Sequence, residues 1–199
     1  KSNHSFDLLS CFPASAEPGK EFTSVTYSNV YFREPESRAD QTRMMSIVTT
    51  GLETGYYVDV FRSRKERGGD KMHDYFYHNL GQTMTLTAAD GTDLNLQPTE
   101  ELAFAGAHLY GYSYLYDKKV AATGKDVKAT FTIDMKDKGG DDIVMNLWMK
   151  GEPDREVFTA LSPMTEGLSR TPGMPYNIKE QPTLTFVARQ HGEAWTRPF

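Results

Sequence analysis

The segment from Asp126 to Lys150 decides the fold class, and it reads DVKATFTIDMKDKGGDDIVMNLWMK. In its first half apolar residues alternate with polar ones, the period-two pattern of a strand with one buried face. The residues expected on that face are Val127, Ala129, Phe131 and Ile133. Asp137–Asp142 is a Gly/Asp-rich turn that leads into a second apolar run. The segment therefore predicts a hairpin of two antiparallel strands.

The rest of the chain repeats this style, with short runs rich in Thr, Val, Tyr and Phe between Gly, Asp and Pro. The ten strands expected are Phe22–Phe32, Arg43–Thr50, Tyr56–Arg64, Met72–Asn79, Met84–Thr87, Ala107–Asp117, Asp126–Asp134, Ile143–Lys150, Glu156–Leu161 and Thr183–Gln190. The sequence RGGD at Arg67–Asp70 predicts a further hairpin. Pro98–Ala103 has a capping-like start and predicts one or two helical turns. We expect an all-β fold, an antiparallel β-sandwich with supersandwich-like layers and at most one or two short helical turns, in a single domain spanning residues 1–199.

Composition excludes several classes of protein. The 199 residues include 22 Lys plus Arg and 27 Asp plus Glu, a net charge of −5, which argues against a nucleic-acid partner. No apolar run approaches the roughly 20 residues of a membrane span. The lone Cys11 allows no internal disulfide and no multi-cysteine metal site. Because the chain starts on Lys1 and stops on Phe199 without a polar tail, we expect a piece of a longer protein.

The segment Asp59–His78 gathers histidines and carboxylates. On a strand, His73 and Tyr75 would share one face, and Asp74 and His78 the other. Such a cluster suits zinc binding or acid/base chemistry. The alternative is that these are hydrogen-bonded sheet residues, with Asp59 paired to an Arg or His across the hairpin.

Two further patterns suggest contact with a ligand. Arg62, Arg64, Lys65 and Arg67 form a local basic run, which would suit a carboxylate- or sulfate-bearing ligand or would simply be a solvated hairpin tip. Four tyrosines, Tyr110, Tyr112, Tyr114 and Tyr116, alternate with other residues and would share one strand face, as a sugar-stacking surface or as a packing wall. Trp148 is expected in the core, and Trp195 at an interface.

The segment Tyr56–Asn79, YYVDVFRSRKERGGDKMHDYFYHN, resembles part of the heparinase II/III-like polysaccharide lyases. Two later segments, DIVMNLWMKGEPDREVFTALSPMTEGLS and PTLTFVARQHGEAWTRPF, are similar to the end of the same module. The resemblance implies an N-terminal helical toroid followed by antiparallel sandwich layers, and cleavage of acidic polysaccharides by β-elimination. It also implies a divalent metal such as zinc or calcium, held by a His-x-His segment, an Asp and a His before an Asn. This sequence has no His-x-His, and Lys1–His4 echoes only the last element, so His4 is the one candidate ligand.

The resemblance leads to one main expectation and one alternative. The chain would be a non-catalytic C-terminal sandwich domain of an acidic-polysaccharide lyase, with no cofactor of its own, exported to the periplasm or secreted. It would support the toroid of the same protein and contact the acidic polysaccharide; the residues chosen for contact or site support are Arg62, Arg64, His73, Tyr75 and His78. No catalytic residue is expected in it. The alternative is a stand-alone carbohydrate-binding or adhesion-like module without enzyme activity.

Overall fold

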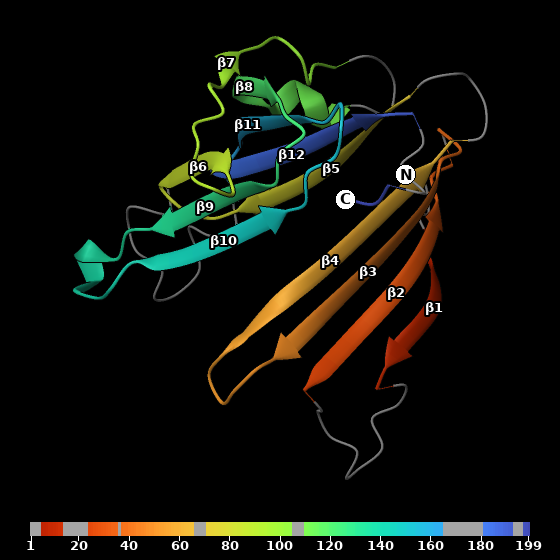
Figure 1. Ribbon diagram of the computed structural model, residues 1–199, viewed down its shortest axis with the longest axis horizontal. Coiled ribbons are helices and arrows are strands. Elements are labelled where there is room, and N and C mark those ends of the chain that lie inside the picture. Colours follow the sequence, from red (N-terminus) through yellow and green to blue (C-terminus); the bar gives the residue numbers. More distant parts are fainter. Residues whose placement is uncertain are drawn as a thin grey trace. The chain divides into compact units, whose positions relative to one another are not determined.

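The computed structural model describes residues 5–13, 24–35, 37–65, 71–104, 110–164, 181–192 and 197–199. Within these ranges the structure consists of antiparallel strands and two short 3-10 helices, which confirms the predicted all-β sandwich class (Figure 1). The elements are β1 (Asp7–Phe12), β2 (Val25–Arg33), β3 (Asp40–Thr49), β4 (Gly55–Arg64), β5 (Met72–Asn79), β6 (Thr83–Ala88), β7 (Gln97–Pro98), η1 (Tyr110–Tyr114), β8 (Tyr116–Ala122), β9 (Val127–Ile133), η2 (Lys136–Lys138), β10 (Ile143–Met149), β11 (Glu156–Ser162) and β12 (Thr183–His191).

The chain divides into two compact units, which are described separately. Unit 1 comprises Lys1–His73 and His191–Phe199, and unit 2 comprises Asp74–Gln190. The single domain over residues 1–199 stays a prediction.

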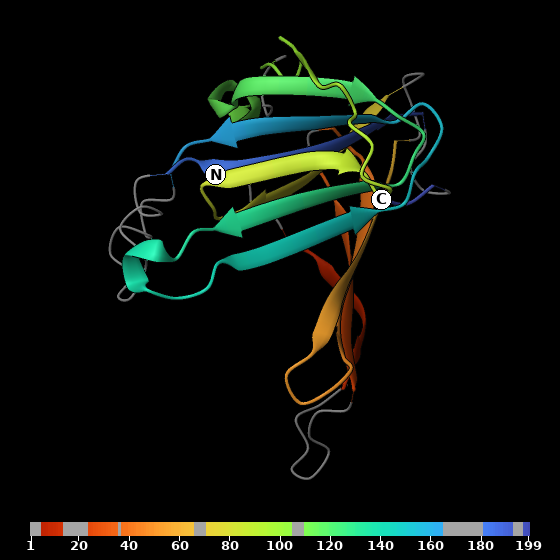
Figure 2. The same cartoon turned by 60° about the vertical axis from the view of Figure 1, so that its left-hand side comes forward.

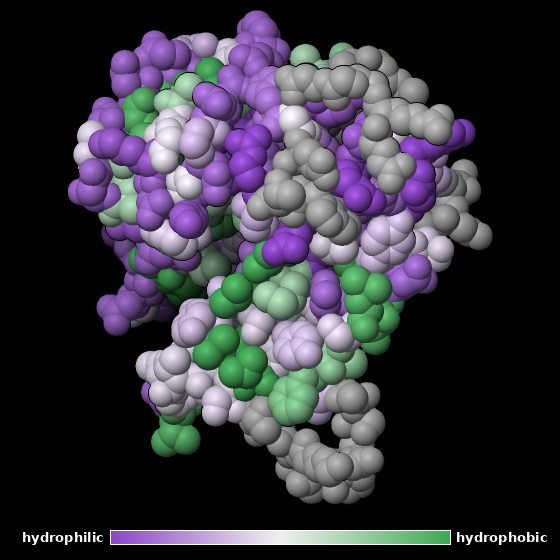
Figure 3. Space-filling view, turned by 45° about the vertical axis from the view of Figure 1, so that its right-hand side comes forward, coloured by the Kyte–Doolittle hydropathy of each residue, from purple (hydrophilic) through white to green (hydrophobic). Residues whose placement is uncertain are grey.

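Unit 1 contains a four-stranded antiparallel sheet in the order β1-β2-β3-β4 (Figure 1). At the edge of β4 that faces away from β3, the backbone N–H of Phe199 donates to the carbonyl of Phe61 at 2.9 Å. The centroids of the two rings lie 5.7 Å apart. Hydrophobic side chains are exposed over this sheet (Figure 3); they include Leu8, Leu9, Met45, Ile47 and Tyr57.

Unit 2 contains a three-stranded sheet, β10-β9-β6, and a five-stranded sheet, β5-β12-β11-β8-β7. The predicted hairpin is confirmed: Ile143 pairs with Ile133, and the intervening turn carries η2, which is capped by Gly139 in the left-handed region (Figure 2). Val127, Ala129 and Phe131 of β9 are buried as predicted. The two sheets meet where the ring of Phe131 lies 5.6 Å from that of Tyr77 on β5.

The opposite face of the five-stranded sheet is covered by the segment that joins β7 to β8. Leu102 and Leu115 of this segment are buried against Phe158 and Ala160 of β11 and Val187 of β12. Unit 2 therefore buries both faces of its central strands, which explains why β12 is buried along almost its whole length.

Two predictions of local structure are wrong. The strand Met72–Asn79 exists, but it lies beside β12 in the five-stranded sheet, so its predicted pairing with the strand Tyr56–Arg64 is wrong. The turn predicted at Arg67–Asp70 lies outside the described residues. The predicted helix at Pro98–Ala103 is absent because the chain continues to pair with β8: Thr99 N–H donates to the Lys118 carbonyl at 3.1 Å.

Two predictions about aromatic residues are also wrong. The tyrosine row does not lie on one strand, because residues 110–114 form the 3-10 helix η1 and β8 begins only at Tyr116. Trp148 is 59% exposed, because in β10 the inward positions are taken by Met145, Leu147 and Met149. Trp195 lies outside the described residues.

Candidate functional site

A cluster of arginines lies at one end of the sheet in unit 1. Strand register places Arg33, Asp40 and Arg64 in one row across β2, β3 and β4, and Tyr31, Thr42 and Arg62 in the next row on the same face. Two residues chosen from sequence, Arg62 and Arg64, therefore do lie together. We call Arg33, Arg62 and Arg64, with Tyr31 and Asp40, the arginine cluster.

Asp40 is the buried centre of the arginine cluster. Its carboxylate accepts hydrogen bonds from the Tyr31 hydroxyl at 2.6 Å, from Arg33 Nη1 at 3.2 Å and from Arg64 Nη2 at 3.4 Å. The hydrogen bond from Tyr31, followed by the two arginines, lowers the pKa of Asp40 below its ordinary value. The same hydrogen bond raises the pKa of the Tyr31 phenol.

The arginine cluster presents guanidinium groups to solvent. Arg33 and Arg62 are exposed, and Arg33 is anchored to the buried carboxylate of Asp40 through Nη1. Each guanidinium group is a planar fork of N–H donors. Such forks match the geometry of carboxylate, sulfate or phosphate groups. The cluster can therefore bind an anion, and it has no group poised for proton transfer near neutral pH.

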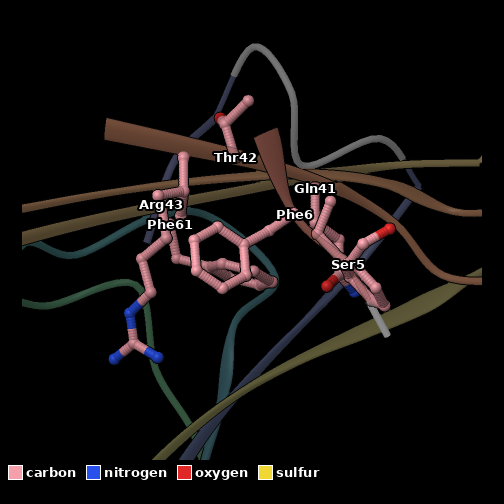
Figure 4. A pocket seen from close by; sticks show the side chains of 8 residues that line it. Ser5, Phe6, Gln41, Thr42, Arg43 and Phe61 are labelled. Carbon is pink, nitrogen blue, oxygen red and sulfur yellow. The ribbon is translucent and has the colours of Figure 1, made fainter. Parts of the chain in front are cut away.

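An apolar hollow of about 470 Å³ lies on the other face of the same sheet. It is lined by Ser5, Phe6, Val30, Phe32, Gln41, Thr42, Arg43 and Phe61. The guanidinium group of Arg43 points away from the rings (Figure 4) and is bound to Asp59, with Nε 2.9 Å from Oδ1. Because Asp59 neutralises the arginine, this hollow is a poorer anion site than the arginine cluster. The predicted partnership of Asp59 with an arginine is confirmed, although the partner comes from β3.

The other three residues chosen from sequence are described by the unit to which each belongs. His73 is buried in unit 1, with Nδ1 2.8 Å from the hydroxyl of Ser63. Ser63 lies between Arg62 and Arg64 on β4 and so faces the opposite side of the sheet. Tyr75 is buried in unit 2.

His78 lies in unit 2, on the same face of β5 as Asp74 and Phe76, as predicted. Its Nδ1 is 2.9 Å from the hydroxyl of Thr185, which lies 2.7 Å from that of Ser162. Partial burial lowers the pKa of His78, which favours the neutral form of the ring. Its hydrogen-bond partner is a threonine hydroxyl and not a carboxylate that could orient the ring for catalysis.

Sequence reasoning missed a buried ionic network in unit 2. Arg189 of β12 forms two hydrogen bonds with Asp74 of β5, at 2.7 and 2.9 Å, and a third with Glu101 at 3.1 Å. The Tyr112 hydroxyl donates to Asp74 at 2.5 Å. Burial, together with the charge of Asp74, raises the pKa of Tyr112 far above its ordinary value. The signal available in the sequence was an arginine inside the apolar run TLTFVARQ.

The sequence offered one candidate metal ligand. Among the described residues, no group of three or more His, Cys, Asp or Glu side chains could hold a metal ion. The candidate ligand His4 lies outside the described residues. In the described part of the chain, no helix is long and apolar enough to cross a membrane.

Fold and site together describe an all-β sandwich with a cluster of arginines on one sheet. No family model matches the sequence. An endo-acting ulvan lyase from Formosa agariphila is 32% identical to this chain over 177 residues, which are 87% of this chain and 20% of the relative. The chain thus spans about a fifth of the length of this curated relative. The expected relation to a polysaccharide lyase is confirmed at this level, and the heparinase II/III-like assignment stays a prediction.

Proposed function

We propose that this chain is the β-sandwich part of a heparinase II/III-like polysaccharide lyase and contacts acidic polysaccharide through Arg33, Arg62 and Arg64. In this proposal the rest of the lyase supplies a helical toroid with the catalytic residues and any divalent metal, and the sandwich supports it. The proposed location is the periplasm or the medium, where a polymeric substrate is met.

The chemistry of a polysaccharide lyase explains why its sandwich part would carry exposed arginines. A lyase that works by β-elimination removes the proton next to a uronate carboxyl group, so its substrate is a polyanion. The observation that carries the proposal is the row of Arg33, Asp40 and Arg64 with Arg62 beside it, because one buried carboxylate holds two forks in place before the ligand arrives. Preorganisation of this kind reduces the entropy lost on binding.

The test is retention of the 199-residue chain on resin-bound ulvan at low salt. Arg33→Ala combined with Arg62→Ala removes two exposed guanidinium groups but keeps the Arg64–Asp40 contact. We expect binding about tenfold weaker, since two exposed charge contacts contribute about 1–2 kcal/mol.

The matched control is Lys119→Ala combined with Lys128→Ala, which removes the same charge from exposed positions of unit 2. This control should bind within about twofold of the wild type. Equal losses in the two double variants would reduce the effect to net charge and refute the arginine cluster as the contact.

A second assay addresses catalysis. The chain alone, incubated with ulvan, should give no rise in the ultraviolet absorbance of an unsaturated product. Such a rise, if abolished by His78→Ala, would show that the sandwich itself carries catalytic groups.

A further inference from the structure

Four exposed aromatic side chains lie on the segment that covers the five-stranded sheet of unit 2 and on the start of β8. They are Phe104, Tyr110 and Tyr114 of that segment and Tyr116 of β8, and we call them the aromatic platform. Tyr110 and Tyr114 are 64% and 62% exposed, and the ring of Tyr110 stacks on that of Phe104 with centroids 5.1 Å apart and an angle of 17°. Flat rings in this setting present wide apolar faces to solvent.

The base of the aromatic platform is held rigidly. Tyr112, between the two most exposed tyrosines, points inward: its hydroxyl bonds to Asp74 at 2.5 Å, and its ring meets the ring of Phe76 edge-on at 5.4 Å. Leu102 and Leu115 are buried on either side of the platform segment. Tyr110 and Tyr114 therefore flank a residue that is fixed by its inward contacts, so a ligand would not have to order η1.

The backbone is strained at both ends of the platform segment. Leu102 and Asp117 have φ angles of 53° and 48°, in the left-handed region that disfavours residues with a Cβ. Strained residues that the surrounding structure holds in place are frequent at ligand sites. This observation is independent of the exposure of the rings.

The chemistry of the aromatic platform favours a sugar ring. Three of its four rings carry a hydroxyl group, which stays hydrated or bonds to sugar hydroxyls while the ring covers the apolar C–H face of a pyranose. The charged residues next to it in the sequence are Glu100, Glu101, Asp117, Lys118 and Lys119, whose charges nearly cancel, so it is not built to attract an anion. The occupant is thus a pyranose ring presenting an uncharged face.

We propose that the aromatic platform is a second glycan-binding site, which stacks a pyranose ring of the polysaccharide without charge contacts. The proposal rests on the proposed function, because that supplies the polysaccharide. It differs from the arginine cluster in one measurable respect. Binding through guanidinium groups weakens as salt rises, whereas stacking does not, because the screening length falls to about 3 Å at 1 M salt.

The test is retention of the 199-residue chain on resin-bound ulvan at 1 M NaCl, with the variant Tyr110→Ala combined with Tyr114→Ala. We expect the wild type to keep salt-resistant binding and this variant to bind about tenfold more weakly, the loss of two stacking contacts. Both side chains are exposed, so the variant should fold with an unchanged unfolding midpoint in urea.

Three controls make the result specific. Tyr110→Phe combined with Tyr114→Phe keeps both rings and should retain binding, and Trp148→Ala removes an exposed ring from the other sheet of unit 2 without effect. Arg33→Ala combined with Arg62→Ala should weaken binding at low salt and leave binding at 1 M NaCl unchanged, which separates failure of this proposal from failure of the first. Absence of salt-resistant binding, equal binding by the Tyr-to-Ala variant, or self-association that the variant abolishes would each overturn the platform as a glycan site.

Discussion

Arg189 and Asp74 form a buried, two-pronged ion pair between β12 and β5, with Nε 2.7 Å from Oδ1 and Nη2 2.9 Å from Oδ2. Each side chain is only 7% exposed. The guanidinium carbon also lies 5.2 Å from the centroid of the Phe158 ring. The pair therefore ties an outer strand of the five-stranded sheet to its neighbour at a place where neither charge can return to water alone.

Asp74→Asn should destabilise the protein strongly. The substitution keeps the shape of the side chain but leaves the Arg189 charge buried, with the half-exposed Glu101 as its remaining anion. Removing one partner of a buried pair costs about 3–5 kcal/mol. Urea unfolding of the variant and the wild type, followed by circular dichroism, measures this difference.

The control for this prediction is an ion pair at the surface of the same unit. Lys125 Nζ lies 3.6 Å from Asp90, with both side chains more than half exposed. Lys125→Ala should change the free energy of unfolding by less than about 1 kcal/mol. If Asp74→Asn were equally mild, the pair would not be buried as described.

Tyr112 should ionise only when the protein unfolds. Burial and the negative charge of Asp74 raise the pKa of its phenol, so the folded state resists its deprotonation. Alkaline titration followed by tyrosinate absorbance should show a late phase that coincides with loss of the circular dichroism signal and is absent in concentrated urea. Tyr112→Phe should remove that phase, and it should cost about 1–3 kcal/mol because Asp74 loses a buried donor. A variant with an unchanged titration would contradict the assignment.

What could be predicted from the sequence was local. The alternation in Val127–Ile133 and the turn after it predicted β9 and β10, and Met72–Asn79 was predicted with the bounds observed for β5. The partner of β5 was not predictable in this way, since β12 begins more than a hundred residues later and the Arg67–Asp70 turn suggested the nearer strand β4. The predicted burial of Trp148 was wrong because apolar residues occur on both faces of β10, so its sequence has no alternation that indicates the buried face.

The candidate sites show the same limit. Arg62 and Arg64 were found because they are two residues apart on one strand and so share a face. Arg33 and Asp40 were missed, because they join these arginines only through the register of β2, β3 and β4. The tyrosine row was noticed, but a 3-10 helix gives three residues per turn, so Tyr112 turns inward while Tyr110 and Tyr114 stay exposed.

Asp40 should make stability depend on pH in the acid range. Its folded pKa is lowered below the ordinary 3.8, so the unfolded chain binds the proton more readily. The stabilisation is therefore complete above the unfolded pKa and is lost as pH falls through the folded pKa. Asp40→Asn should be less stable than the wild type by about 1–3 kcal/mol at pH 7, because Arg33 and Arg64 lose a charged acceptor. Urea unfolding at pH 7, 5 and 3 should show this gap narrowing once the pH falls below the ordinary pKa of 3.8; a gap independent of pH would contradict the role of the carboxylate.

Gly151 and Gly140 lie in two turns of unit 2 and differ in the space that each leaves for an added Cβ. A Cβ added at Gly151 would lie 2.3 Å from the carbonyl oxygen of Gly124 and 2.4 Å from the carbonyl carbon of Lys125, both backbone atoms that cannot move aside. Its N–H also donates to Asp126 at 2.7 Å, which fixes the turn after β10. Gly151→Ala should therefore cost about 2 kcal/mol or more. At Gly140 the nearest atom to an added Cβ is 3.9 Å away, so Gly140→Ala should be neutral or stabilise by up to about 1 kcal/mol through the unfolded chain. Urea unfolding of the two variants checks the contrast, and equal free energies would mean that the turn after β10 relaxes without cost.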